Sequence, residues 1–505
     1  MTLISRVFGY LRDAVIFILF GASGYTDAFF VAFRIPNFLR RLFAEGAFSQ
    51  AFVPVLSEYK EQRGKAELKG LVDHAAGALA LVLGLVTALG MIAAPLIITV
   101  FAPGFWADDA VRFELATDML RITFPYLFFI SLTALAAGIL NSFGRFAVPA
   151  LTPVFLNLSL IGAAIWLAPR FEIPVIALAW GVFIAGVVQF AFQIPFLKRL
   201  GLLPRPRLQR AHEGVRRIGR LMLPAIFGSS VVQINLLVDT LIASFLAVGS
   251  ISWLYVSDRF VEFPLALFGI AVATVILPRL SRQHAQSAPE AFNRTLDWAL
   301  RTMVVMSIPT MFGLMLLAGP ILTTLIQYRE FTFNDTQMAR LSMIAFAFGL
   351  PAFIMIKVLA PGFYARQDTK TPMRIGVIAM LVNMVLNVAL VVPWVYSGWP
   401  GPHAALALAT SLCAYLNAGL LYRRLRGDGV LHPQAGWRKL LMQVSLATAI
   451  MFAVVIAYTP ALSQWSSWLV TQRGLALASL ILVGAAVYFF VLLASGVRPK
   501  QFALK

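Results

Sequence analysis

The feature that most constrains this chain is a series of apolar stretches, each about 18 residues or longer, that recurs along the whole sequence. A stretch of that length can cross a bilayer as a helix. Hydrophobic residues make up 60% of the 505 residues and charged residues only 12%, whereas soluble proteins contain about 25% charged residues. These properties exclude a soluble globular enzyme and predict an all-α polytopic membrane protein.

Apolar windows bounded by charge, Gly and Pro predict about fourteen transmembrane helices. The predicted spans lie near 2–21, 26–57, 71–101, 114–141, 147–168, 173–197, 219–247, 250–279, 298–320, 337–363, 374–395, 403–422, 440–459 and 474–495. Several exceed the roughly 20 residues needed to cross, so we expect them to tilt, break or protrude.

The distribution of Lys and Arg supports this count. The even-numbered connections and the C-terminal tail hold 28 of these residues, and the odd-numbered connections hold 4. Cytoplasmic loops carry such an excess of positive charge. The split therefore predicts that both termini are cytoplasmic and that the number of spans is even.

The two halves of the sequence resemble each other at an offset of about 224–228 residues, which indicates an internal repeat. The segment 52–57 aligns with 276–281, and Gly138 aligns with Gly362. Six spans per repeat give the halves the same orientation, as in transporters with two lobes around a central cavity. The predicted division is an N-lobe at 1–200, a C-lobe at 215–426 and two further helices at 436–496.

Nine basic residues lie inside or at the ends of predicted spans, where each charge costs roughly 2.5–3.5 kcal/mol at the bilayer centre. They are Arg6, Arg12, Arg34, Arg40, Arg41, Arg121, Arg259, Arg340 and Lys357. Such residues must face a wet cavity, pair with acids or lie near the interface.

Helical spacing places acids near some of these cations. Arg41 and Glu45 are four residues apart and can pair, while Asp258, Arg259 and Glu262 cluster within about one turn. Structural ion pairs that lock helices together would explain single residues. Because cations outnumber acids in the first half, we interpret the whole cluster as a site for an anion, since Arg suits phosphate.

A second group of polar residues offers oxygen ligands for a small cation. Asn383 and Asn387 lie one turn apart in the eleventh predicted span, and Asp239 lies in the seventh. They form a candidate sodium site, with ordinary interhelical hydrogen bonding as the alternative. The single cysteine, Cys413, excludes a disulfide framework.

The basic connection 197–220 carries eight Lys and Arg residues. It could contact anionic lipid head groups on the inner leaflet, or it could be a plain cytoplasmic loop that obeys the charge rule. The sequence has no GxxxxGK[ST] motif, so we do not expect ATP hydrolysis by this chain. The placement of the basic residues also gives no reason to expect nucleic acid as a partner.

Five segments closely resemble the MurJ/MviN family. They are Ser5–Asp13, Thr26–Asn37, Leu39–Pro54, Gln233–Thr240 and Asp258–Pro264. The resemblance runs from residue 4 to the final span. It implies membership of the multidrug/oligosaccharidyl-lipid/polysaccharide exporter superfamily.

The resemblance implies a transporter rather than an enzyme. It implies a multi-pass protein of the bacterial inner membrane that flips lipid II, the undecaprenyl-pyrophosphate-linked precursor of peptidoglycan, by alternating access. Cell-wall biogenesis and cell shape would depend on it. The last two helices would form, with the lobes, a groove for the lipid tail.

Residue roles also follow from the resemblance. The family's functional residues correspond here to Arg6, Arg12, Arg40, Arg259 and Asp27, with Ser5 and Glu45 at lesser positions. Our hypothesis is that Arg6, Arg12 and Arg259 contact the pyrophosphate. Arg40 and Asp27 are expected to gate or shape the portal between the lobes.

Two departures from the family pattern qualify these expectations. Family members usually have further residues before Ser5, so the first helix as given should be short on its cytoplasmic side. Sodium-binding members carry an acid near the position of Asn387, which weakens the sodium hypothesis. We expect no other cofactor, and either sodium or the membrane potential would supply the energy.

Lipid II and membrane lipids are the expected partners, and the chain is expected to be a monomer near cell-wall synthesis proteins. The nearest alternatives are an exporter of another polyprenyl-pyrophosphate glycan and a cation-coupled drug antiporter. An antiporter for cationic drugs should have an acidic, aromatic cavity rather than an Arg-rich one. A membrane glycosyltransferase would need catalytic carboxylates near an interface, and fourteen helices in a repeat fit a carrier better than a channel.

Overall fold

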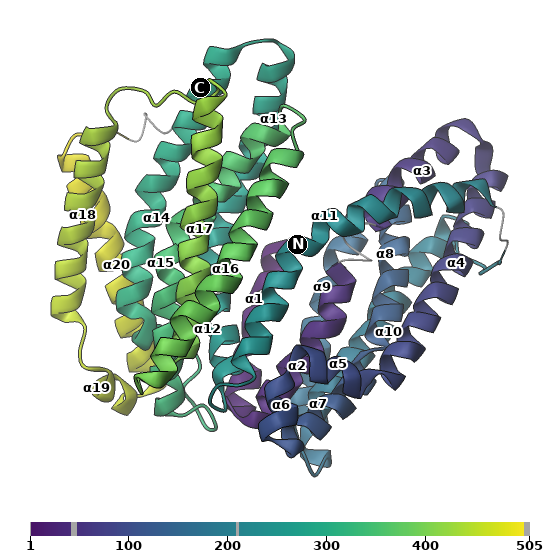
Figure 1. Ribbon diagram of the computed structural model, residues 1–505, viewed down its shortest axis with the longest axis horizontal. Helices are drawn as coiled ribbons and strands as arrows, with labels where there is room; N and C mark the ends of the chain where they lie inside the picture. The colour runs from purple at the N-terminus through teal and green to yellow at the C-terminus, as the bar shows by residue number, and fades with distance from the viewer. Residues whose placement is uncertain (1, 42–47, 209–211, 499–505) are drawn as a thin grey trace. The chain divides into compact units, whose positions relative to one another are not determined.

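The computed structural model describes residues 2–41, 48–208 and 212–498, and all regular elements in these ranges are helices. The chain forms two compact units, Met1–Ser252 and Trp253–Lys505 (Figure 1). The long helix at 213–243 belongs to the first unit in the structure. The division into lobes at 1–200 and 215–426 with a terminal pair at 436–496 stays a prediction.

The first unit holds the helices up to the start of α12. They are α1 (Thr2–Phe20), α2 (Gly24–Arg40), α3 (Ser49–Gln62), α4 (Gly64–Ile92), α5 (Ala94–Phe101), α6 (Pro103–Asp108), α7 (Ala110–Thr123), α8 (Tyr126–Ser142), α9 (Ala147–Gly162), η2 (Ala163–Leu167), η3 (Ala168–Arg170), α10 (Ile176–Arg199) and α11 (Glu213–Ala243).

The chain passes into the second unit along α12. That unit contains most of α12 (Ser250–Pro264), then η4 (Leu265–Ile270), α13 (Ala271–Ala285), α14 (Pro289–Leu325), α15 (Phe333–Tyr364), α16 (Lys370–Tyr396), α17 (His403–Gly427), α18 (Trp437–Tyr458), α19 (Leu462–Ser467) and α20 (Val470–Ala494).

Eleven helical segments in the described part of the chain are long and apolar enough to span a membrane. They coincide with the predicted spans three to six and eight to fourteen. The other three predicted spans fall on α1, on α2 with α3, and on α11, which carry charged residues. The helices are thus consistent with fourteen spans, and the chain is a multi-pass membrane protein.

Several long predicted spans are broken, as expected. The span at 71–101 divides into α4 and α5 just before Pro95, and the span at 114–141 divides into α7 and α8 at Pro125. Proline removes a backbone donor and clashes with the preceding turn, so a helix breaks or bends there. After Pro264 the backbone continues as the π-helical segment η4.

The internal repeat is visible in the packing. In the first unit, Phe52 of α3 is buried and contacts Gly138 of α8. Their repeat counterparts are Ile276 of α13, which is also buried, and Gly362 of α15, and α13 packs against α15 in the second unit. Each unit therefore places the matched proline-containing segment against the matched glycine-containing helix.

The surface is apolar where a soluble protein would be polar. On α20, Leu475, Leu482 and Phe490 are exposed at intervals of about two turns, which places them on one face of the helix. Such a continuous apolar face suits contact with lipid tails. The opposite face of α20 packs against α14 and α18 (Figure 1).

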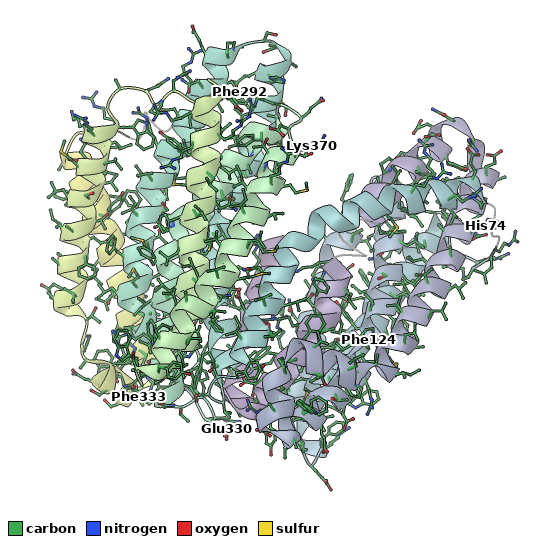
Figure 2. The ribbon with its side chains drawn as sticks, viewed as in Figure 1. His74, Phe124, Phe292, Glu330, Phe333 and Lys370 are labelled. Carbon is green, nitrogen blue, oxygen red and sulfur yellow. The ribbon has the colours of Figure 1, made fainter. Side chains whose placement is uncertain are left out.

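Within the second unit, connections that the charge pattern assigns to one side of the membrane lie at one end. Figure 2 shows Phe292 and Lys370, both from predicted cytoplasmic connections, at one end of this unit. Glu330 and Phe333, from a predicted outer connection, lie at the other end. The helices therefore cross the unit in alternating directions, as the Lys and Arg distribution predicts.

Candidate functional site

Arg12 is a predicted basic residue that a carboxylate and an amide hold in place. It lies on α1, which packs against α9 within the first unit, and only 6% of its surface is exposed. Its Nε and Nη2 atoms donate to Oδ1 of Asp13 at 2.9 and 2.6 Å, and Nη1 donates to Oδ1 of Asn157 at 3.1 Å. The guanidinium is therefore oriented from two sides, by a carboxylate and by a neutral amide.

Arg6 and Ser5 lie on the same helix, about two turns before Arg12, and both are half-buried. The carbonyl oxygen of Ser5 accepts a hydrogen bond from Nδ2 of Asn157 at 3.1 Å. Among the residues that the structure describes, Arg6 has no ion-pair or hydrogen-bond partner. Its charge is therefore available to an anion.

The basic residues of α2 contact neutral oxygen atoms. Arg34 donates to the hydroxyl of Thr240 on α11, and Nε of Arg40 donates to Oδ1 of Asn37 at 2.9 Å. Arg41 follows the end of α2 and is half-buried. Glu45 lies outside the described residues, so its pairing with Arg41 stays a prediction.

Asp27 lies in the first turn of α2 and is almost completely buried, with 1% of its surface exposed. Its Oδ2 accepts the backbone N–H of Gly249 at 2.7 Å. Its Oδ1 accepts the backbone N–H and the hydroxyl of Ser252, at 2.9 and 2.6 Å. The carboxylate therefore ties the start of α2 to Gly249 and to the first turn of α12.

Arg259 lies in the second unit and is predicted to contact the substrate. It is half-buried on α12, where Nη1 donates to Oε2 of Glu262 at 2.6 Å and Nη2 donates to the hydroxyl of Tyr255 at 3.2 Å. Its guanidinium also lies 5.0 Å from the centre of the Tyr255 ring. Asp258 and Glu262 are exposed on the same helix, so the predicted cluster of charges on α12 is present.

The candidate sodium ligands divide between the two units. Asn383 and Asn387 are buried on α16, and Nδ2 of Asn387 donates to Oδ1 of Asn383 at 3.1 Å. Asp239 lies on α11 of the first unit. This bond joins two residues of the same helix, so it is not the interhelical hydrogen bonding that was the alternative to a cation site, and sodium binding stays a proposal.

The basic connection after α10 is tied to α4. The backbone N–H of Arg205 donates to Oδ1 of Asp73 at 2.7 Å, and that of Arg207 donates to the carbonyl oxygen of Asp73 at 3.1 Å. Farther along, the ring of His212 stacks on that of His74 at 4.7 Å. Burial, and then the nearby His74, lower the pKa of His212.

Asn157 was not among the predicted site residues, and Lys357 was predicted only as one of the nine basic residues in spans, without a role. Asn157 is 5% exposed and bridges α9 to α1, and an amide inside an apolar span was the signal that could have found it. Lys357 is exposed on α15 and has no ion-pair or hydrogen-bond partner within the described ranges. Its position inside a membrane-spanning helix was the corresponding signal.

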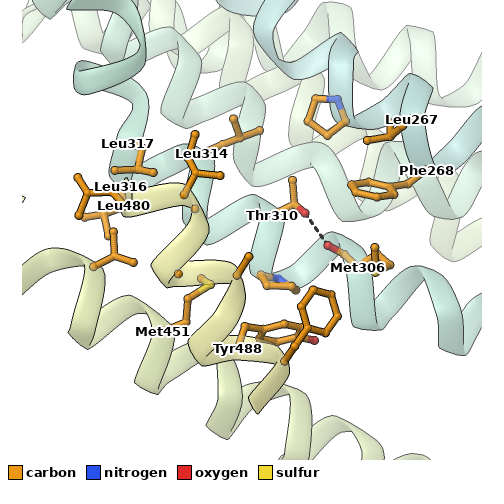
Figure 3. Close-up of a pocket in the computed structure, with 18 of the residues that line it drawn as sticks. Leu267, Phe268, Met306, Thr310, Leu314, Leu316, Leu317, Met451, Leu480 and Tyr488 are labelled. Carbon is orange, nitrogen blue, oxygen red and sulfur yellow. Dashed lines mark hydrogen bonds between the residues drawn. The ribbon is translucent and has the colours of Figure 1, made fainter. Parts of the chain in front are cut away.

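The second unit also contains an apolar pocket of about 400 Å³, lined by α12, η4, α14, α18 and α20 (Figure 3). Leu267, Leu314, Met451 and Leu480 are among its lining residues. The hydroxyl of Thr310 donates to the carbonyl of Met306 at 2.7 Å, and that of Tyr488 donates to the carbonyl of Val305 at 2.6 Å. Because backbone carbonyls take up both hydroxyls, the pocket suits a hydrocarbon chain.

Comparison with known proteins relates this chain to one family of membrane transporters. The family model described as lipid II flippase MurJ matches residues 16–476. A probable lipid II flippase MurJ of Vibrio cholerae is 48% identical, covering 99% of this chain and 95% of its own length. The lipid II flippase MurJ of Burkholderia cenocepacia is 40% identical, covering 99% of this chain and 96% of its own length.

Solved structures of related transporters share the fold of this chain. A lipid II flippase MurJ in an inward closed conformation is 29% identical, with a TM-score of 0.81 over 97% of this chain and 96% of that one. An inward-facing multidrug resistance transporter of the MATE family has a TM-score of 0.67 over 85% of this chain and 95% of that one, at 15% identity, and shows a shared fold alone. The family match over nearly the whole sequence, with relatives of 40% identity and above, establishes that this chain belongs to the lipid II flippase MurJ family.

Proposed function

We propose that this chain moves lipid II from the inner to the outer leaflet of the bacterial cytoplasmic membrane by alternating access. The observation that carries the proposal is the charge of α1 and α2, which hold four arginines against two aspartates inside membrane-spanning helices. Cations at that depth are costly, and such residues therefore usually line a substrate or ion pathway. A pyrophosphate is the anion on lipid II that such cations would compensate.

Arg6, Arg12 and Arg259 are the residues proposed to contact the pyrophosphate during transport. A guanidinium presents donors in a fixed fork that matches phosphate oxygens. Arg12 is already oriented by Asp13 and Asn157, and Arg259 by Glu262 and Tyr255. Arg40 and Asp27 are proposed to shape the path of the substrate rather than to bind it.

The apolar pocket of the second unit is the proposed site for part of the undecaprenyl tail. Its lining is almost entirely hydrocarbon, and the exposed faces of its helices are apolar as well. A tail that stays in such surroundings never has to enter water, which would cost about 0.8 kcal/mol per methylene. The charged head group would then move separately from the tail.

Both termini are proposed to be cytoplasmic, because the Lys and Arg residues gather in the even-numbered connections. The membrane potential can act on the cavity charges at about 2.3 kcal/mol per charge per 100 mV. Sodium bound near Asn383 and Asn387 is the alternative source of energy. Replacing sodium with potassium while holding the potential constant separates these two sources.

Growth of bacterial cells depleted of their own lipid II flippase tests the function. We expect this chain to restore growth, and Arg12→Ala and Arg259→Ala to fail at matched membrane levels. Arg121→Ala is the control, because Arg121 is exposed on α7 and pairs with Asp118 at 3.0 Å. Full growth with both variants would contradict the role of the arginines, and no growth with the well-expressed wild-type chain would contradict the substrate.

A further inference from the structure

We propose that Asn157 is a positioning residue for Arg12, so that substrate affinity depends on an amide on α9 as well as on the charges of α1. This inference rests on the proposed function, because Arg12 must contact the substrate anion for its orientation to matter. The evidence is the pair of hydrogen bonds that Asn157 makes to α1. Oδ1 accepts from Nη1 of Arg12, and Nδ2 donates to the carbonyl oxygen of Ser5, each at 3.1 Å.

The local geometry explains how one amide reaches both groups. Side chains on a helix lean toward its N-terminus, so the Arg12 guanidinium lies back along α1. Gly9 stands between the two contacts, and a β-carbon there would lie 3.9 Å from Nδ2 of Asn157. That distance is an ordinary van der Waals contact, so Asn157 packs directly over α1 between its two hydrogen bonds.

The bond to Ser5 fixes the amide as well as the helix. An amide can be turned so that either its oxygen or its nitrogen faces a neighbour. Because the Ser5 carbonyl can only accept, it holds Nδ2 toward α1 and leaves Oδ1 for Arg12. Asn157 is 5% exposed, so water competes little for either bond.

A neutral partner suits an anion-binding arginine better than a second carboxylate would. Asp13 already offers one negative charge to the Arg12 guanidinium at 2.6 Å. A further acid at position 157 would cancel more of the positive charge that the substrate needs. An asparagine orients the guanidinium without cancelling its positive charge. We therefore predict that Asn at position 157 supports anion binding better than Asp does.

Equilibrium binding of lipid II to the purified protein in nanodiscs tests the proposal. Asn157→Leu keeps the approximate volume of the side chain and removes both bonds, and we expect it to weaken binding about tenfold, as for a hydrogen bond to a charged group. Asn157→Asp keeps an acceptor for Arg12, and we expect it to weaken binding more than Asn157→Leu does. Thr152→Val is the control, because Thr152 is buried on the same helix and bonds Gln193 rather than α1.

A double-mutant cycle separates positioning from a general effect on the fold. If Asn157 acts through Arg12, then Asn157→Leu will cause no further loss of affinity in an Arg12→Ala background. Equal further losses in both backgrounds, or wild-type binding by Asn157→Leu when Arg12→Ala is impaired, would overturn this inference alone. Wild-type binding by Arg12→Ala would instead overturn the proposed role of Arg12.

Discussion

Single polar residues in this protein are held by partners far away in the sequence, and Asp27 shows the energetic consequence. Its buried carboxylate accepts three hydrogen bonds from Gly249 and Ser252. Asn at this position would present an N–H group to a backbone donor. We expect Asp27→Asn to lower the free energy of unfolding by about 1–3 kcal/mol, the cost of leaving a buried donor unsatisfied.

Thermal unfolding of the purified protein in detergent measures this effect. Ser252→Ala is the matched variant, because it removes only the hydroxyl bond and should cost about 1 kcal/mol. Unfolding of Asp27→Asn at the wild-type temperature would show that the carboxylate does not hold the turn before α12.

The sequence predicted which residues carry charge inside the membrane, but it could not predict their partners. Arg12 and Asn157 are separated by 145 positions, and Arg34 and Thr240 by 206. Spacing along one helix identifies neighbours on that helix only. Contacts between helices depend on packing, which apolar periodicity does not specify.

At the scale of elements, the connection after α10 crosses α4 so closely that only glycine fits beneath it. A β-carbon at Gly77 would lie 2.2 Å from the carbonyl oxygen of Arg207. The side chains of Arg207 and Leu208 are exposed, but the backbone of Arg207 is bonded to Asp73. We expect Gly77→Ala to displace this backbone and to speed trypsin cleavage of the Arg207–Leu208 bond, followed by mass spectrometry. Gly70→Ala on the same helix meets no atom within 4 Å and should be cut at the wild-type rate; equal rates for both variants would contradict the close crossing.

The same connection should loosen in acid. Since burial and His74 lower the pKa of His212 from its usual value near 6.5, the unfolded connection binds more protons than the folded one as the pH falls through 6.5. Acidification therefore favours the released form, and the docked form is most stable above that pH. Tyr59, Glu213, Arg63 and Glu67 also lie around His212.

Hydrogen exchange at the amides of Arg205 and Arg207, corrected for its intrinsic pH dependence, reports this release. Protection should fall between pH 7 and pH 5.5 in the wild type and change less in His212→Phe, which keeps a stacking ring. An identical fall in both proteins would assign the pH dependence to another group.

A larger side chain at one glycine can occupy the apolar pocket of the second unit without a clash of its β-carbon with the lining residues. Gly313 lines it, and a β-carbon there meets no atom within 4 Å. We expect Gly313→Phe to slow transport of lipid II with a full-length tail and to leave an analogue with a short tail less affected. Gly376→Phe, at an equally open position on α16, is the control; equal slowing of both substrates would argue against a tail site.

For the whole molecule, hydropathy predicted an all-helical multi-pass membrane protein, and eleven of the fourteen predicted spans coincide with described helices that are long and apolar enough to cross a membrane. Two of the other predicted spans differ from an ordinary apolar span in a visible way: α1 carries Arg6, Arg12 and Asp13 within 19 residues, and α2 has only 17 residues. The length of the predicted spans indicated that some helices would break, but it did not predict that the breaks would lie near Pro95 and Pro125. The pocket formed by α14, α18 and α20 depends on which faces of three helices meet, which the sequence alone does not specify.

The central proposal is that arginines inside the membrane move a pyrophosphate-linked lipid across it. Translocation of fluorescent lipid II in vesicles that contain only this protein tests that claim most directly. We expect the wild-type chain and Arg121→Ala to move lipid II, and Arg12→Ala and Arg259→Ala not to move it. Undiminished translocation by both arginine variants, or none by the correctly inserted wild-type chain, would contradict it.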